Sequence, residues 1–154
     1  MLNTAHGPSG VADRVIACAM FTLLIERKHK VLLTRFSGTL RHEVLLAQAV
    51  AAHRIAASEG QTRGLLDFSA VKTIDMSVET AKEMGMRPQN ITNQVRVYVM
   101  PNSDQFAGAR MFGTYQDIAG NIAPHVVRTM AEAYRILQIT DPDFQSLEID
   151  PPAI

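Results

Sequence analysis

Along most of its length the chain alternates between short apolar segments and longer segments of helical character. The short segments are rich in β-branched and aromatic residues, as strands are, and the longer ones follow capping residues and stop at Gly or before Pro. The expected strands are 21–26, 31–36, 63–68, 94–100 and 125–128, and the expected helices are 39–58, 77–86, 103–119 and 129–138. This order predicts a hairpin followed by right-handed crossover units. We expect an α/β fold: a two-layer sandwich with a mixed sheet of about five strands and helices mainly on one face.

The expected strand 94–100 has a two-residue repeat. Val95, Val97 and Val99 alternate with the larger and more polar Arg96 and Tyr98. Successive side chains of a strand point to opposite faces of the sheet. We therefore expect the valines under the helices, with Arg96 and Tyr98 on the less covered face.

The two longest expected helices differ in character. Helix 39–58, which Thr39 can cap, is rich in alanine and therefore suits close packing. Helix 103–119 gathers these apolar residues on one side: Ala107, Met111, Phe112, Tyr115, Ile118 and Ala119. Phe106 and Arg110 lie on the opposite side, one turn apart. Such pairs are enriched where proteins dock, so they are a candidate partner surface. The alternative is that Phe106 packs under a neighbouring loop.

The chain divides into a single domain with two flanking segments. Residues 1–19 are expected to form an N-terminal arm or lead-in, because Gly7, Pro8 and Gly10 interrupt any periodicity. Residues 20–139 contain all the predicted strands and helices. Residues 140–154 are acidic and contain Pro142, Pro151 and Pro152, so we expect a loosely held C-terminal tail.

Composition excludes several classes of protein. The 154 residues carry 15 Lys and Arg against 15 Asp and Glu, so no broad positive field favours nucleic acid. Cys18 is the only cysteine, which excludes an internal disulfide and favours a reducing compartment. The apolar run 15–25 is too short to span a bilayer. We expect a cytoplasmic protein without membrane insertion.

The segment 65–77 is the most informative local motif. It reads Leu-Leu-Asp-Phe-Ser-Ala-Val-Lys-Thr-Ile-Asp-Met-Ser, an apolar strand that reaches Asp67 and then delivers Asp75 and Ser77 to a helix start. It resembles the Asp-Leu-Ser and Asp-Ser-Ser-Gly segment of the STAS (SpoIIAA-like) family of anti-sigma-factor antagonists. Segments 106–112 and 129–137 are similar to the uncharacterised bacterial STAS-like branch. The resemblance covers about 21–138 and implies the fold derived above.

By this resemblance, Ser77 matches the serine that partner kinases phosphorylate in anti-sigma-factor antagonists. A phosphate at a helix N-terminus meets free amides and a favourable dipole. Met76 and Val78 replace the small residues of the family pattern, however. The alternative is that Ser77 is an ordinary helix cap.

The neighbouring polar residues form a candidate switch loop: Asp67, Ser69 and Asp75. An acid–base or cation role for the two carboxylates would require further groups that converge on them, and none is evident in the sequence. The simpler interpretation is that Asp67 binds loop amides, Asp75 caps a helix and Ser69 is a turn hydroxyl.

No enzymatic or metal-binding pattern emerges. His42 and His53 lie on one helix, but a rise of about 1.5 Å per residue separates them by roughly 16 Å, too far for one metal ion. The sequence contains no phosphate-binding glycine loop and no nucleophile elbow. We expect no catalytic residues, no metal and no cofactor.

Two functional interpretations remain. The first is a non-enzymatic regulatory or protein-interaction module of STAS-like type with an unidentified protein partner, switched by phosphorylation of Ser77. The alternative is a binding protein for an apolar or lipid-like small molecule, since STAS-like folds are compared with lipid-transfer domains and this chain has 8 Met. An open sheet edge also makes a homodimer an expectation.

Overall fold

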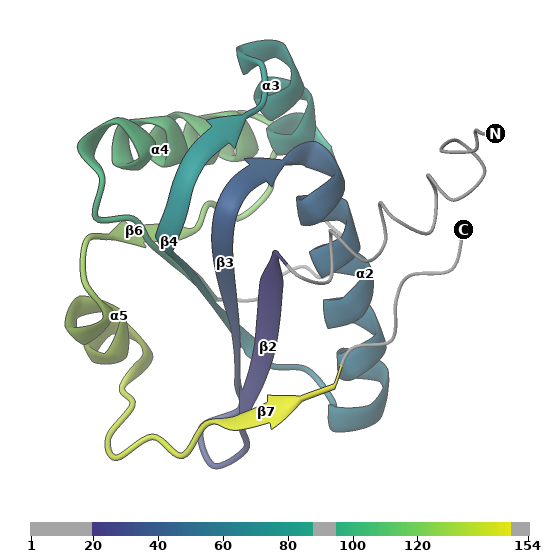
Figure 1. Ribbon diagram of the computed structural model, residues 1–154, viewed down its shortest axis with the longest axis vertical. Coiled ribbons are helices and arrows are strands. Elements are labelled where there is room, and N and C mark those ends of the chain that lie inside the picture. Colours follow the sequence, from purple (N-terminus) through teal and green to yellow (C-terminus); the bar gives the residue numbers. More distant parts are fainter. Residues whose placement is uncertain (1–19, 88–94, 149–154) are drawn as a thin grey trace, which may run out of the picture.

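The computed structural model describes residues 20–87 and 95–148 (Figure 1). The elements in chain order are β2 (Phe21–Glu26), β3 (Val31–Arg41), α2 (His42–Glu59), β4 (Arg63–Asp75), α3 (Val78–Met86), β5 (Arg96–Val99), α4 (Ser103–Ile118), β6 (His125–Val127), α5 (Met130–Leu137) and β7 (Gln145–Leu147). Residues 1–19, 88–94 and 149–154 lie outside the described residues. The N-terminal arm expected at 1–19 therefore stays a prediction.

One mixed sheet of six strands organises the fold, in the order β6-β5-β4-β3-β2-β7. Strands β3 to β6 are parallel, whereas β2 is antiparallel to both β3 and β7. The α/β sandwich with a mixed sheet is therefore confirmed. The sixth strand, β7, comes from Gln145–Leu147, within the segment that the sequence analysis assigned to the tail.

The helices cover the two faces of the sheet unequally. Side chains of α2 and α4 join one core cluster, and α3 contacts α4. Of the helices in the described residues, α5 alone packs on the other face. Figure 1 shows α2 and α5 on opposite sides of the strands. The prediction that the helices lie mainly on one face of the sheet is therefore confirmed.

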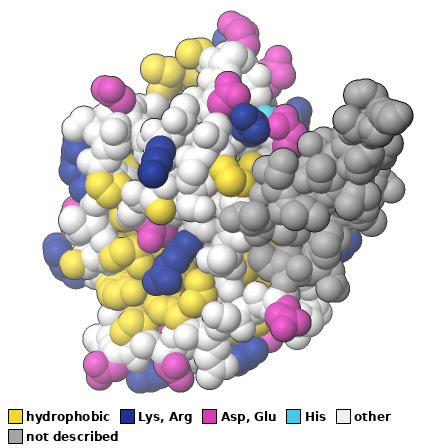
Figure 2. Space-filling model, in the orientation of Figure 1, with side chains coloured by type: hydrophobic (Ala, Val, Ile, Leu, Met, Phe, Trp, Pro, Cys, Tyr) yellow, Lys and Arg dark blue, Asp and Glu magenta, His cyan; other side chains and the backbone are white. Residues whose placement is uncertain are grey.

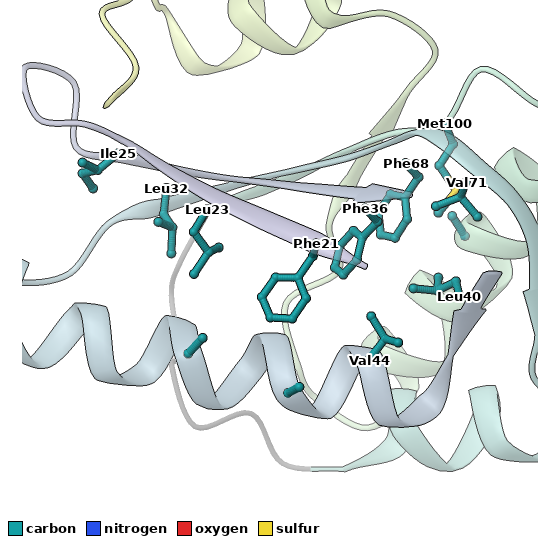
Figure 3. Close-up of a cluster of buried hydrophobic side chains, with 13 residues drawn as sticks. Phe21, Leu23, Ile25, Leu32, Phe36, Leu40, Val44, Phe68, Val71 and Met100 are labelled. Carbon is teal, nitrogen blue, oxygen red and sulfur yellow. The ribbon is translucent and has the colours of Figure 1, made fainter. Parts of the chain in front are cut away.

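An aromatic row crosses the face under α2 and α4. Phe36 and Phe68 stack with ring centroids 4.8 Å apart, Phe21 lies 6.1 Å from Phe36, and Tyr98 lies 5.4 Å from Phe68. Each of the strands β2, β3, β4 and β5 contributes one ring, and Figure 3 shows the three phenylalanines side by side above α2. Such pairs each contribute about 0.5–1.5 kcal/mol beyond area burial. The row therefore ties four strands together.

Strands β3 and β4 are longer than predicted. Thr39 does not cap α2 but pairs with Thr73 in the parallel ladder, and α2 begins at His42 without a side-chain cap. The register shifts between Arg35 and Ser37 and again between Gly38 and Thr39, so the ladder continues past two irregularities. The ladder extends as far as Arg41, which pairs with Asp75, so pairing with β4 outweighs the local capping preference of Thr39. The expected loop 69–75 is consequently strand.

The buried side of α4 also differs from the prediction. It consists of Ala109, Gly113 and Gln116, while Met111 and Ile118 of the predicted face are 51% and 66% exposed. Small residues let the α4 backbone approach its neighbours closely, so the residues of least hydrophobic area are the ones that are buried. A prediction from hydrophobic periodicity therefore assigns the wrong residues to a buried helix face made of small residues.

The side chains of β5 alternate between the two faces of the sheet as predicted, but the faces are covered differently than expected. Val97 and Val99 are buried under α5, whereas Val95 is 39% exposed. Arg96 and Tyr98 point the opposite way, as expected, but that face carries α2 and α4 and is not the less covered one.

Candidate functional site

A cavity of about 660 Å³ lies on the sheet face that carries α2, α3 and α4. Its floor comes from the parallel strands β3, β4 and β5, where the register aligns Leu32, Gly64 and Arg96 in one row and Thr34, Leu66 and Tyr98 in the next. Farther along the strands the floor continues through Phe68 and Met100. Cavities of roughly 300–1,000 Å³ are the size of small-molecule sites.

Small side chains create this space. On α2, Ala49, Ala52 and Ala56 face the cavity, whereas Ala47 and Ala51 are buried against the sheet. On α4, Gly108 also lines it, and a Cβ added there would meet no atom within 4 Å. The alanines of α2 therefore serve two purposes: close packing on one side and open volume on the other.

The cavity wall is mainly apolar with a few polar groups. Its larger apolar side chains include leucine, methionine and aromatic residues: Leu32, Leu40, Leu45, Leu66, Phe68, Met76, Met84, Met100, Phe112 and Tyr115. Near the middle of the floor, Gln48 donates from Nε2 to Thr34 Oγ1 at 3.0 Å. Thr34 is only 1% exposed, so this bond satisfies a polar group that burial would otherwise penalise.

Arg96 and Tyr98 form a second polar pair on the wall. Arg96 Nη1 donates to the Tyr98 hydroxyl at 3.2 Å, and Nη2 donates to the carbonyl of Ile122. The aliphatic stem of Arg96 lies beside Gly64 of β4, where an added Cβ would lie 3.3 Å from Arg96 Cγ. Burial raises the pKa of the Tyr98 phenol above its usual value, although the positive charge and hydrogen bond of Arg96 oppose that rise. Tyr98 therefore stays protonated near neutral pH.

Ser77 caps α3 and borders the same cavity. Its exposed hydroxyl oxygen accepts from the Thr80 backbone N–H at 3.1 Å and donates to Thr80 Oγ1 at 2.9 Å. The capping interpretation from sequence therefore describes Ser77. Asp75 is not the cap but accepts from Arg41 Nε at 3.3 Å in an exposed ion pair between β4 and β3.

The predicted switch loop is not a single cluster. Asp67 accepts from both the backbone N–H and the hydroxyl of Ser69, which matches the expected turn-like interaction. Both residues nevertheless belong to β4, and the extended strand separates them from Asp75 and Ser77. Because Phe68 points to the α2 face, its neighbour Asp67 points to the α5 face. Asp67 and Ser69 therefore lie apart from Asp75, which ends β4, and from Ser77.

The predicted partner surface needs a correction at Phe106. Its ring is half-buried, packs against the core cluster and lies 4.3 Å from the Arg128 guanidinium carbon. Arg110 is exposed and lies 6.0 Å from the same ring. Phe106 sits on the buried side of α4 because the helix turns its small residues inward. The alternative reading, a packed aromatic, describes it better.

Sequence reasoning missed the polar groups of the cavity. Arg96 and Tyr98 were assigned to an open face, and Gln48 and Thr34 were not singled out. The available signal was the interruption of a valine strand by Arg and Tyr at positions that share a face. What faces them depends on the placement of α2 and α4, which the pattern of β5 does not contain.

Two other features are absent from the described part of the chain. Among residues 20–87 and 95–148, no cluster of His, Cys, Asp and Glu could hold a metal ion. No helix within those ranges is both long and apolar enough to cross a bilayer. On the face drawn in Figure 2, positive and negative side chains are interspersed and apolar side chains gather between them.

Comparison with known proteins does not assign the chain to a family. No family model matches the chain, and no curated protein matches it in sequence. The STAS resemblance therefore stays a prediction.

Proposed function

We propose that this protein binds an apolar or lipid-like small molecule in the cavity between α2, α3, α4 and the sheet. The observation that carries the proposal is the cavity itself, about 660 Å³ with a mainly apolar wall and few polar groups. Ligand sites have this composition: hydrophobic lining supplies affinity, and a small number of polar groups set orientation.

The size of the hydrophobic term makes such binding plausible on physical grounds. Each methylene removed from water contributes about 0.8 kcal/mol. A ten-carbon chain would thus gain roughly 8 kcal/mol before the cost of association, which is several kcal/mol. The net gain is at most about 4 kcal/mol, which corresponds to millimolar affinity, so micromolar affinity requires a longer apolar chain or additional polar contacts.

The test uses N-phenyl-1-naphthylamine, an uncharged probe whose fluorescence rises in apolar surroundings. Gly108→Leu should place a side chain in the open volume, because a Cβ there meets nothing within 4 Å. Leucine is also a better helix former than glycine, so the variant should melt no lower than wild type. Ala107→Leu, at an exposed position of the same helix that does not line the cavity, is the matched control.

Wild type and Ala107→Leu should bind the probe with the same affinity, and Gly108→Leu should bind it at least about tenfold more weakly. Lipid extraction of the purified protein followed by mass spectrometry should recover an apolar compound. Equal probe binding by all three proteins, or a crystal structure with the cavity filled by side chains of this chain, would refute the proposal.

A second candidate function is the regulatory module switched at Ser77. It is supported by the exposure of the Ser77 hydroxyl at the start of α3, a helix that also borders the cavity. Phosphate there would lie at a favourable helix end. Phosphopeptide mass spectrometry of protein from its native cells is the test, and unmodified Ser77 under every growth condition would leave the residue as a cap only.

A further inference from the structure

We propose that the ligand is a single-chain amphiphile with an anionic head, and that Arg96 and Tyr98 bind this head. The inference rests on the proposed function, because it assigns polarity to the same cavity. It identifies a class of ligand, a long-chain carboxylate or phosphate monoester, where the cavity volume alone specifies only an apolar compound.

Arg96 has donor capacity to spare at the cavity wall. A guanidinium carries five N–H groups, and the described contacts use one for the Tyr98 hydroxyl and one for the Ile122 carbonyl. Within residues 20–87 and 95–148, no carboxylate forms an ion pair with it. A bound carboxylate or phosphate would supply the negative charge and take paired N–H donors in the geometry that arginine favours.

Tyr98 adds a second donor at the same place. Its hydroxyl oxygen already accepts from Arg96, so its own proton is free to be donated to a ligand oxygen. Because Tyr98 stays protonated, this donor persists near neutral pH. Two donors from neighbouring positions on one face of β5 therefore converge on one point of the wall.

The charges along the cavity also give it a direction. Arg96 aligns with Gly64 and Leu32, at the beginning of the parallel strands. The acidic lining residue, Asp104, is in the first turn of α4, which follows the carboxyl end of β5. Apolar floor residues, Leu66 and Phe68, lie between them. An anionic head is thus favoured at Arg96 and disfavoured at the other end, with the chain lying over the apolar floor.

The experiment compares amphiphiles of equal chain length below the concentrations at which they aggregate. Dodecanoate and monododecyl phosphate carry anionic heads, dodecanol is uncharged, and dodecyltrimethylammonium is cationic. Dissociation constants are measured by displacement of N-phenyl-1-naphthylamine from wild type, Arg96→Gln and Arg96→Lys. Arg54→Gln, at an exposed position of α2 outside the cavity lining, is the matched control.

Wild type should bind at least one anionic amphiphile about 10- to 100-fold more tightly than dodecanol, as expected for a charged hydrogen bond. Arg96→Gln should lose this preference while its affinity for dodecanol is retained, and Arg96→Lys should keep part of it. Arg54→Gln should match wild type. The more tightly bound of the two anions identifies the head group.

Two failures are distinguishable. If dodecanol and both anions bind wild type equally, or if Arg96→Gln keeps the full preference, the head-group assignment is wrong and the apolar site stands. If no amphiphile and no probe binds, the proposed function falls as well. Tighter binding of the cationic amphiphile than of either anion would also overturn the assignment.

Discussion

Replacing Gly85 by alanine should destabilise the protein even though alanine is the better helix former. Gly85 is buried in α3 where this helix meets α4, and an added Cβ would lie 2.9 Å from Tyr115 Cβ and 3.2 Å from the Phe112 carbonyl oxygen. Both atoms are fixed to the α4 backbone, so neither can yield by a side-chain rotation. The helices themselves would have to separate. Gly108, the helical glycine whose added Cβ meets nothing within 4 Å, is the natural control.

The expected magnitude follows from two opposing effects. A change from glycine to alanine within a helix contributes up to about 1 kcal/mol. Overpacking of a close contact costs about 1–3 kcal/mol. Gly108→Ala should therefore gain about 0.5–1 kcal/mol, whereas Gly85→Ala should show a net loss of up to about 2 kcal/mol.

Urea denaturation monitored by circular dichroism measures both variants against wild type. The midpoints should move in opposite directions with an unchanged slope, because the surface exposed on unfolding is the same. Equal stabilisation by Gly85→Ala and Gly108→Ala would refute the close approach of α3 and α4, and with it the position of one wall of the cavity.

Two further changes test the local structure. Burial alone would raise the pKa of Glu26, but hydrogen bonds from the His29 ring and from the backbone N–H groups of Lys28 and His29 outweigh it, so the pKa lies below its ordinary 4.5. The stability that the Glu26 carboxylate contributes is complete above about pH 4.5 and is lost as the pH falls through the lowered pKa. Glu26→Gln should therefore lower the free energy of unfolding by about 1–3 kcal/mol at pH 7 and by progressively less in acid. Urea titrations at several pH values check this, and a cost that does not change with pH would contradict it. Ser77→Ala should cost about 1 kcal/mol, or roughly 2–4 °C in melting temperature, whereas Ser77→Asp should melt near wild type because aspartate also caps. Equal melting of Ser77→Ala and wild type would contradict the cap.

The sequence patterns predicted which segments are strands and helices more reliably than which surfaces they share. β-branched and aromatic runs predicted β2 with its observed bounds, the first half of β4 and, to within one residue, β6. Thr129 correctly marked the start of α5, where it accepts from the Glu132 N–H. These features depend on local residue preferences, which a single sequence contains. Strand β7 has only the three residues Gln145, Ser146 and Leu147 and no apolar repeat, so its pairing with β2 had no local signal.

The errors in the candidate site have a common physical origin. Ala109 and Gly113 are buried because they permit close approach, whereas Met111 is 51% exposed, so hydrophobicity ranks these residues in the wrong order. The strand that joins Asp67 to Asp75 likewise depends on the long ladder with β3. A cavity depends on several such placements at once, and no segment alone encodes it.

The two faces of the central strands also differ in a way that supports the proposed ligand-binding role. Under α5, the buried residues from β3, β4 and β5 are all aliphatic and almost fully buried: Val31, Leu33, Leu65, Val97 and Val99. The same strands present Thr34, Gly64, Arg96 and Tyr98 toward α2 and α4, where polar groups need partners and glycine supplies no packing area. Open volume in a core sacrifices contacts that would stabilise the fold. A chain that builds a buried aliphatic layer on one face and a cavity lined by arginine and tyrosine on the other gives up stability on the second face. Occupation of that face by an amphiphile would restore the missing contacts, with its apolar chain over Leu66 and Phe68 and its head at Arg96.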